Sequence, residues 1–280
     1  MNEIDNNWSH LNAELIGGHV VKGTACSISG SGKVLVLIHG VGLDRALWDQ
    51  HAEELSRDYC VIRLDLPGHG DSAPAPEGAT IETFADQLIA LLDHFQIERV
   101  AVAGYSLGAL TTQSIINRYP HRLARVALLY SVYNRNAESR AAVAQRLAQA
   151  ESEGTASLIN NALARWFSPE FISNNPAVES KIRARLLNNN TEHFLTAYRI
   201  FVTSNVSVAN TIDSHITPAL VMTGELDPGS TPDMSKQIAA DIPGSKLVVI
   251  QGARHMGIIE YFDDTIRHLR DWLAVDPKQN

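Results

Sequence analysis

The residues most able to do chemistry lie in a short stretch, Gly104-Tyr105-Ser106-Leu107-Gly108. An apolar, strand-like run (99–103) precedes this stretch, and a helical pattern (107–118) follows it. In that context, G-x-S-x-G is typical of a nucleophilic serine on a sharp strand-to-helix turn, where bulky neighbours would clash with a strained backbone. We therefore interpret Ser106 as a candidate nucleophile. The five-residue motif alone also fits a glycine-lined helix start with an idle serine.

A serine hydroxyl is a weak nucleophile unless a base removes its proton. Of the eleven histidines, His255 is in the best position, because it follows a late strand-like run (245–250) in the loop Q-G-A-R-H-M-G. A single histidine is more often a surface or core residue. Its place after the last strand, relative to Ser106, favours the role of the base.

The base in turn needs a carboxylate that fixes its tautomer. The strand-like run 218–223 leads into G-E-L-D-P, which offers Glu225 and Asp227. We favour Asp227, because it lies beyond the strand end and Pro228 keeps the loop extended; Glu225 is the alternative. The order serine, aspartate, histidine is one of the known orders of such triads.

Two backbone amides are expected to stabilise the oxyanion that forms when a serine attacks a carbonyl. The N–H of Leu107 is one, because it lies at a helix N-terminus. The other is expected in the glycine-containing loop after an early strand, where Val41 is favoured and Gly42 is the alternative. His39 is interpreted as a hydrogen-bonding brace of this loop.

The elements that must position these residues alternate along the chain. Buried parallel strands read as continuous apolar, β-branched runs, and the strand–helix alternation predicts a parallel sheet with helices on both faces. The sequence therefore predicts an α/β fold with a mostly parallel, eight-stranded sheet. The predicted strands are two within 14–29, at the antiparallel edge, and 33–38, 59–64, 99–103, 124–130, 218–223 and 245–250; the predicted helices are 80–95, 107–118, 232–241 and 262–273.

Residues 131–212 break this alternation, because they contain helical patterns and no strand-like run. We interpret them as a helical cap over one end of the sheet, inserted into a core domain formed by residues 1–130 and 213–280. The cap has eight basic and six acidic residues, a net charge of +2, whereas the whole chain carries −8.

The positive balance of the cap suggests a carboxylate-bearing substrate. Helix-surface arginines are usually solvated, so each is only a candidate. The expected substrate-binding residues are Arg165, Trp166, Arg146 and Tyr130, and further candidates are Arg135, Arg140, Trp48, Phe167 and Tyr198.

Composition excludes several function classes. The chain is acidic, so it has no general attraction for nucleic acid or an anionic membrane, and no window resembles a membrane-spanning helix or a secretory signal. Two cysteines, Cys26 and Cys60, form no disulfide or metal pattern. We expect a cytoplasmic protein without metal or organic cofactor that acts on a small molecule; a homo-oligomer is left open.

Taken together, five motifs resemble those of the α/β-hydrolase superfamily over nearly the whole chain. They are I-H-G-V-G (38–42), D-L-P-G-H-G-D-S (65–72), G-Y-S-L-G (104–108), G-E-L-D-P (224–228) and G-A-R-H-M (252–256). The cap and A-R-W-F-S-P-E-F (164–171) resemble 3-oxoadipate enol-lactonases and related small-acid hydrolases. The serine at position 106 distinguishes the chain from haloalkane dehalogenases, which have aspartate there.

The resemblance implies hydrolysis of a carboxylic ester or lactone through an acyl-enzyme. Three alternatives use the same scaffold: cleavage of a carbon–carbon bond in a vinylogous diketone, hydrolysis of an amide, and peracid formation beside esterase activity. A non-catalytic binding protein is a further alternative, which predicts no covalent labelling by a fluorophosphonate.

Overall fold

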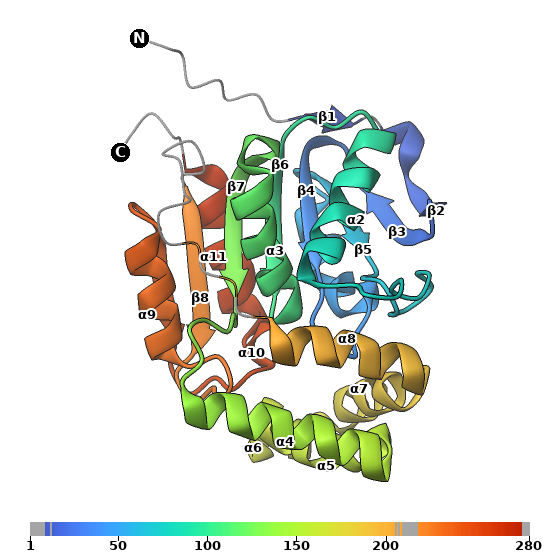
Figure 1. Cartoon of the computed structure of the whole chain (residues 1–280). Coiled ribbons are helices and arrows are strands. Elements are labelled where there is room, and N and C mark those ends of the chain that lie inside the picture. Colours follow the sequence, from blue (N-terminus) through green and yellow to red (C-terminus); the bar gives the residue numbers. More distant parts are fainter. Residues whose placement is uncertain (1–8, 12, 205, 207, 209–217, 276–280) are drawn as a thin grey trace.

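The computed structural model describes residues 9–11, 13–204, 206, 208 and 218–275. Its centre is a mainly parallel sheet of nine strands in the order β2-β3-β5-β4-β6-β7-β8-β9, with β1 paired to β4 (Figure 1). β1, β2 and β3 make antiparallel pairs, and β4 to β9 pair in parallel. The strands are β1 (His10–Leu11), β2 (Gly17–Val21), β3 (Thr24–Ser29), β4 (Gly32–Ile38), β5 (Cys60–Leu64), β6 (Val100–Tyr105), β7 (Leu123–Leu129), β8 (Ala219–Gly224) and β9 (Lys246–Ile250).

All eight strands expected from the sequence are present, and the sheet has one strand more. The additional strand, β1, spans two residues and pairs antiparallel with the start of β4. A two-residue strand is too short to produce a hydrophobic period, so the sequence contains no signal for it.

Helices cover both faces of the sheet. In β4, Val34, Val36 and Ile38 belong to one hydrophobic cluster, and Leu35 and Leu37 belong to the other. The first cluster contains buried side chains of α2, α3 and α9, and the second contains those of α1 and α11. Successive side chains of a strand point to opposite faces, so a strand covered on both faces must be apolar at every position. The helices are α1 (Asp49–Leu55), α2 (Ile81–His94), α3 (Leu107–Arg118), α9 (Pro232–Asp241), α10 (Gly257–Glu260) and α11 (Phe262–Ala274), with short 3-10 helices η1 (Ala13–Leu15), η2 (Arg45–Trp48) and η3 (Pro120–Arg122).

Within the described residues five helices form the cap, which lies across the carboxyl ends of the parallel strands (Figure 1). Three of them begin at a side chain that accepts a backbone N–H of the first turn, namely Asn136, Ser168 and Asn190; such caps satisfy otherwise unpaired amides. The expected boundary between cap and core, at residues 212 and 213, lies outside the described residues. The cap helices are α4 (Ala137–Glu153), α5 (Ile159–Trp166), α6 (Pro169–Asn174), α7 (Pro176–Leu187) and α8 (Thr191–Thr203), with η4 (Thr155–Leu158).

None of the helices in the described part of the chain is long and apolar enough to cross a membrane.

Three fully buried histidines make stability depend on pH. Burial lowers the pKa of His51 to about 4, and it lowers the pKa values of His39 and His69 to about 3. An unfolded chain protonates histidine near pH 6.5. Below that pH the unfolded state binds more protons than the folded state, so stability is complete above about pH 6.5 and is lost as the pH falls towards the folded pKa values.

His51→Gln is expected to weaken this pH dependence. The Nε2 atom of His51 lies 3.0 Å from the carbonyl oxygen of Ile258, and a glutamine amide retains a donor for it. Urea unfolding at pH 7 and pH 5 should show a loss of stability that is smaller in the variant by about 1–2 kcal/mol. His94→Gln, at an exposed position of α2, is the control. Equal losses of stability in the parent and in His51→Gln would contradict a contribution of His51 to this pH dependence.

Candidate active site

Ser106 lies on a strained turn between β6 and α3. Its backbone has φ 55° and ψ −111°, a left-handed conformation that a residue with a Cβ rarely adopts. Its N–H donates to the carbonyl oxygen of Leu129 at the end of β7, at 2.9 Å. The side chain is only 3% exposed. The end of the sheet therefore fixes this turn against its own strain.

The glycines on either side of Ser106 are required by close backbone packing. A Cβ atom on Gly104 would lie 2.2 Å from the carbonyl oxygen of Gly108, and one on Gly108 would lie 2.3 Å from that of Ile38. Any larger residue would push α3 away from the ends of β4 and β6. The G-x-S-x-G pattern is thus explained by the contact of a helix start with two strands.

His255 lies beside Ser106, in the loop between β9 and α10. Its Nε2 atom is 3.2 Å from the Ser106 hydroxyl oxygen. The Tyr105 hydroxyl donates to the His255 carbonyl at 2.9 Å, and the two rings lie 5.2 Å apart. On the cap side, the N–H of Met256 donates to the Trp166 carbonyl at 2.8 Å. The histidine loop is therefore held both by the turn that bears Ser106 and by the cap.

Asp227 completes the chain of side chains. Its Oδ2 atom lies 2.6 Å from His255 Nδ1, and its Oδ1 atom accepts the N–H groups of Gly229 and Ser230 at 2.8 and 3.0 Å. A buried carboxylate held in this way fixes the proton of the imidazole on Nδ1. Nε2 is then left as an acceptor that faces Ser106.

Glu225, the alternative acid, does not approach His255. Its Oε2 atom accepts the N–H of Gly252 at 2.9 Å, and its residue is exposed. Of the two acids in the G-E-L-D-P motif, the structure brings only Asp227 to the imidazole.

The loop after β4 passes directly beside Ser106, since a Cβ atom on Gly40 would lie 3.2 Å from the Ser106 Cβ. Within this loop, His39 fixes the orientation of the peptide group between Gly40 and Val41. The N–H of Leu66 donates to His39 Nε2 at 3.0 Å, so the imidazole proton lies on Nδ1, which donates to the Gly40 carbonyl at 2.7 Å.

The direction of this peptide decides where the Val41 amide points. The Gly40 carbonyl accepts both His39 and, at 3.2 Å, the N–H of Leu43. In a trans peptide the N–H points opposite to the C=O, so the Val41 N–H points away from His39. At Gly42, with φ 76°, a Cβ atom would lie 3.0 Å from Leu186 of the cap. This geometry supports Val41 rather than Gly42 as the second oxyanion donor, beside Leu107 at the start of α3.

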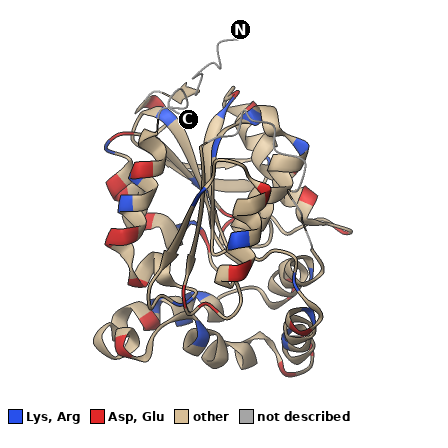
Figure 2. Ribbon diagram, turned by 90° about the vertical axis from the view of Figure 1, so that its left-hand side faces the viewer, with Lys and Arg blue, Asp and Glu red and all other residues tan. Residues whose placement is uncertain are grey.

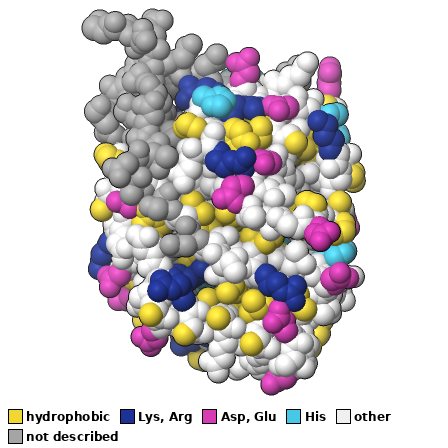
Figure 3. Space-filling model, in the orientation of Figure 1, with side chains coloured by type: hydrophobic (Ala, Val, Ile, Leu, Met, Phe, Trp, Pro, Cys, Tyr) yellow, Lys and Arg dark blue, Asp and Glu magenta, His cyan; other side chains and the backbone are white. Residues whose placement is uncertain are grey.

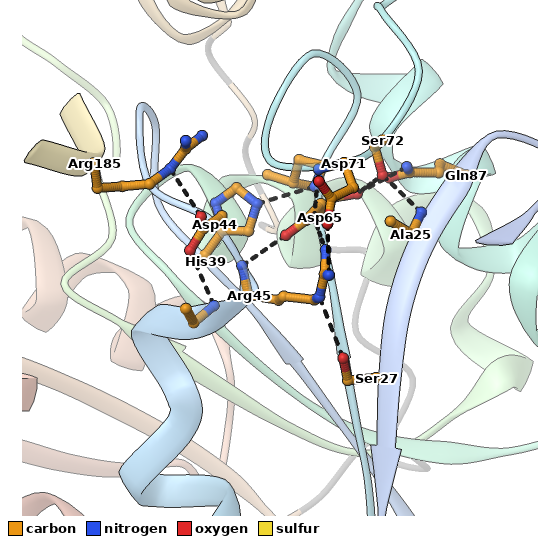
Figure 4. Close-up of polar contacts among 12 residues, drawn as sticks. Ala25, Ser27, His39, Asp44, Arg45, Asp65, Asp71, Ser72, Gln87 and Arg185 are labelled. Carbon is orange, nitrogen blue, oxygen red and sulfur yellow. Dashed lines mark hydrogen bonds and ion pairs between the residues drawn. The ribbon is translucent and has the colours of Figure 1, made fainter. Parts of the chain in front are cut away.

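A polar network at the carboxyl end of β5 supports the loop (Figure 4). Asp65 is the centre of this network, because it accepts the backbone N–H groups of Arg45 and Asp71, at 2.7 and 2.9 Å, and also contacts the Arg45 guanidinium. Arg185 of α7 pairs with Asp44 at 2.9 Å. The cap thus contacts the same loop that carries Val41.

Core and cap enclose a cavity of about 360 Å³ in front of Ser106. The core contributes Ser106, Asp227, His255 and Val41 to its lining, and the cap contributes polar and aromatic side chains. The cap residues in the lining include Arg135, Arg146, Arg165, Trp166, Tyr198 and Phe201. Sequence reasoning therefore identified residues on both sides of this cavity.

The cavity arginines differ in how they are held. Arg135 is buried and donates to the carbonyl oxygens of Phe201 and Ser204 at 3.1 and 3.2 Å, which gives it a structural role. The Nε atom of Arg146 lies 3.4 Å from the Tyr198 hydroxyl. Arg165 has no hydrogen-bond or ion-pair partner among the described residues, and burial followed by the neighbouring Arg146 lowers its pKa.

Several expected contact residues lie elsewhere. Tyr130 is fully buried and is not among the residues that line the cavity; its ring stands at 88° to the His255 ring, 5.9 Å away, so the two rings pack edge to face. Trp48 and Phe167 are also buried core residues outside the lining. Arg140 donates to the Arg135 carbonyl. Bulky aromatic residues more often fill cores than line pockets.

Three residues that hold Asp227 and the His255 loop in place were not identified from the sequence. Gly229 and Ser230 hold Asp227, and Tyr105 holds the His255 loop. A turn after the acid is signalled by Pro228-Gly229-Ser230, but Tyr105 occupies the variable position of its motif, which gives no signal. Among the described residues, no group of three or more His, Cys, Asp or Glu side chains could hold a metal ion.

The fold and this arrangement agree with the family comparison. The model of the α/β-hydrolase fold family matches residues 33–261, which cover the sheet from β4 to β9, the cap and the three side chains described above. The chain belongs to the α/β-hydrolase fold family.

Individual relatives extend this result. The chain is 34% identical, over 89% of its length and 93% of the relative's, to an (E)-2-((N-methylformamido)methylene)succinate hydrolase of Acinetobacter baylyi. Two solved structures are similar to this chain with a TM-score of 0.81. The enol-lactonase from Burkholderia xenovorans is 28% identical, and the match covers 92% of this chain and 100% of that one. A malate-bound thermophilic esterase from Thermogutta terrifontis is 27% identical, and the match covers 95% of this chain and 98% of that one. The expected resemblance to enol-lactonases is thereby confirmed, and hydrolase activity is supported.

Proposed function

We propose that the chain is a serine hydrolase that cleaves a carboxylic ester or lactone through an acyl-enzyme. One observation carries the proposal: Ser106, His255 and Asp227 form a continuous chain of contacts, at 3.2 and 2.6 Å, that opens into a cavity. These distances are within the range in which a proton can pass from a serine to a base.

The reaction proceeds in two halves. His255 takes the proton of Ser106 as the serine oxygen attacks the carbonyl carbon, and the N–H groups of Val41 and Leu107 stabilise the oxyanion. The imidazolium then gives its proton to the leaving oxygen, and an acyl-Ser106 remains. A water molecule, deprotonated by His255, attacks the acyl carbon and releases the acid and the free serine.

The charges of the cavity favour a substrate with at least one carboxylate. Three arginines line it, and Arg165 is unpaired within the described chain and half-buried, which suits it for binding a carboxylate by a charge-assisted hydrogen bond. Elsewhere both signs of charge are distributed over core and cap (Figures 2 and 3). Against the three arginines, the lining of the cavity contains two acidic residues, Glu138 and Asp227, so the balance of arginines over acids there is positive by one charge.

The relatives support the same substrate class. The hydrolase of Acinetobacter baylyi is named for a substituted succinate, which is a dicarboxylate, and the esterase structure contains malate. Because the succinate carries a formamido group, hydrolysis of an amide is the second candidate reaction, on the same three side chains.

Arg165→Ala tests the proposal on a panel of esters, lactones, amides and diketo acids in anionic and neutral forms. The variant is expected to raise KM about 10-fold or more for anionic substrates and to leave KM for neutral esters within about 2-fold, because a charge-assisted hydrogen bond contributes about 1.5–3 kcal/mol. Arg183→Ala, at a partly exposed position of α7 that is not part of the cavity lining, removes the same charge from the cap as a control. An equal rise of KM for neutral and anionic substrates would contradict carboxylate binding.

A further inference from the structure

A second, smaller cavity adjoins the catalytic one inside the cap, and we call it the side cavity. It has a volume of about 60 Å³. Four of its lining residues, Val41, Arg165, Trp166 and Tyr198, also line the cavity that contains Ser106. The two spaces therefore share a wall. The other lining residues are Thr155, Leu158, Ile159, Ala162, Leu186 and Phe194.

The chemistry of the side cavity is apolar. Six of its ten lining residues have hydrocarbon side chains, and the five of these that belong to the cap are each at most 9% exposed. A polar group placed there would lose its hydration for little return, whereas an alkyl group would be stabilised by about 0.8 kcal/mol for each CH₂ removed from water.

The volume limits the size of the occupant. An apolar protein cavity of about 150 Å³ accommodates benzene. The side cavity has less than half of that volume, at 60 Å³, so it accommodates a chain of about two or three carbons.

We propose that the side cavity is a subsite for a short alkyl group of the substrate. This inference rests on the proposed function, because the occupant is part of the molecule that Ser106 attacks. Val41 links the two: its N–H is the expected oxyanion donor, and the residue lines both cavities. A carbonyl bound at that N–H has the side cavity next to it. The alkyl group belongs either to the acyl part or to the leaving alcohol.

Ala162→Leu tests the subsite by filling it with three more carbons. One arm of the test uses 4-nitrophenyl esters from acetate to octanoate, and the other uses methyl to hexyl esters of a single acid. In the arm whose chain enters the side cavity, the variant is expected to lower kcat/KM for the chain with three alkyl carbons (the butanoate or the propyl ester), relative to the shortest chain, by about 10-fold or more. Ala164→Leu, the same substitution at an exposed position of α5, should retain the parent profile.

Leu158→Ala is the complementary variant, which enlarges the side cavity and should move the preferred chain to one longer by about two carbons. This variant tests the subsite if Ala162→Leu does not fold. An unchanged chain-length profile in a folded variant, or an equal loss for all chain lengths, would overturn the subsite. A parent inactive on every ester and lactone would instead contradict the proposed function, so the two failures are distinguishable.

Discussion

Replacing Ser106 by alanine is expected to lower kcat/KM by at least about 10⁴-fold, because among the described residues only the Ser106 hydroxyl is hydrogen-bonded to the imidazole of His255. Alanine keeps the Cβ atom and therefore the same left-handed backbone strain, with φ 55°, so the melting temperature should change little. Activity on the best ester of the panel and thermal unfolding measure the two quantities.

Covalent labelling tests whether Ser106 is the nucleophile. A fluorophosphonate should add one adduct to the parent, and none to Ser106→Ala, by intact mass. Ser114→Ala, at another buried serine of α3, should retain labelling and activity. A Ser106→Ala variant that still turns over substrate would refute the acyl-enzyme, and a parent that is never labelled would favour a binding protein.

Asp227→Asn is expected to lower kcat by about 10⁴-fold while the fold is retained. The Oδ1 atom must still accept the N–H groups of Gly229 and Ser230, so the amide NH₂ would face His255. An amide donor at Nδ1 forces the imidazole proton onto Nε2, and the ring can then no longer accept the proton of Ser106.

Glu225→Gln is the matched control, because it is the same change of carboxylate to amide two residues earlier. Its side chain contacts Gly252 rather than the imidazole, so kcat should stay within about 2-fold of the parent. A large loss in Glu225→Gln together with a small loss in Asp227→Asn would reverse the assignment of the acid. Steady-state kinetics over the pH range in which the parent is active would show which outcome holds.

Much of the fold could be predicted because parallel strands have a simple sequence pattern. β4 is apolar at consecutive positions because one cluster takes Val34 and Val36 and the other takes Leu35 and Leu37. The cap was predicted from the absence of such runs. β1 could not be predicted, because two residues are too few to show a hydrophobic period. This strand forms by pairing with the start of β4.

The candidate site divides in a similar way. Ser106, His255 and Asp227 were predicted from motifs that lie at the ends of strands, and parallel strands bring their carboxyl ends to one edge of the sheet. Tyr130 was wrongly expected at the substrate, although it does follow the end of β7. With a left-handed φ of 52°, its buried side chain packs against the His255 ring. No local sequence pattern indicates that direction.

Hydrophobic period and short-range turn requirements are enough to predict the α/β class, the presence of a helical cap and the residue types at the ends of the strands. Three further points depend on the tertiary structure: which acid contacts His255, which way the Val41 amide points, and which arginine, Arg135 rather than Arg165, has partners within the described part of the chain. These choices depend on where atoms far apart in the chain meet. A difference of a few ångströms in that meeting point decides whether a side chain reacts, binds or supports.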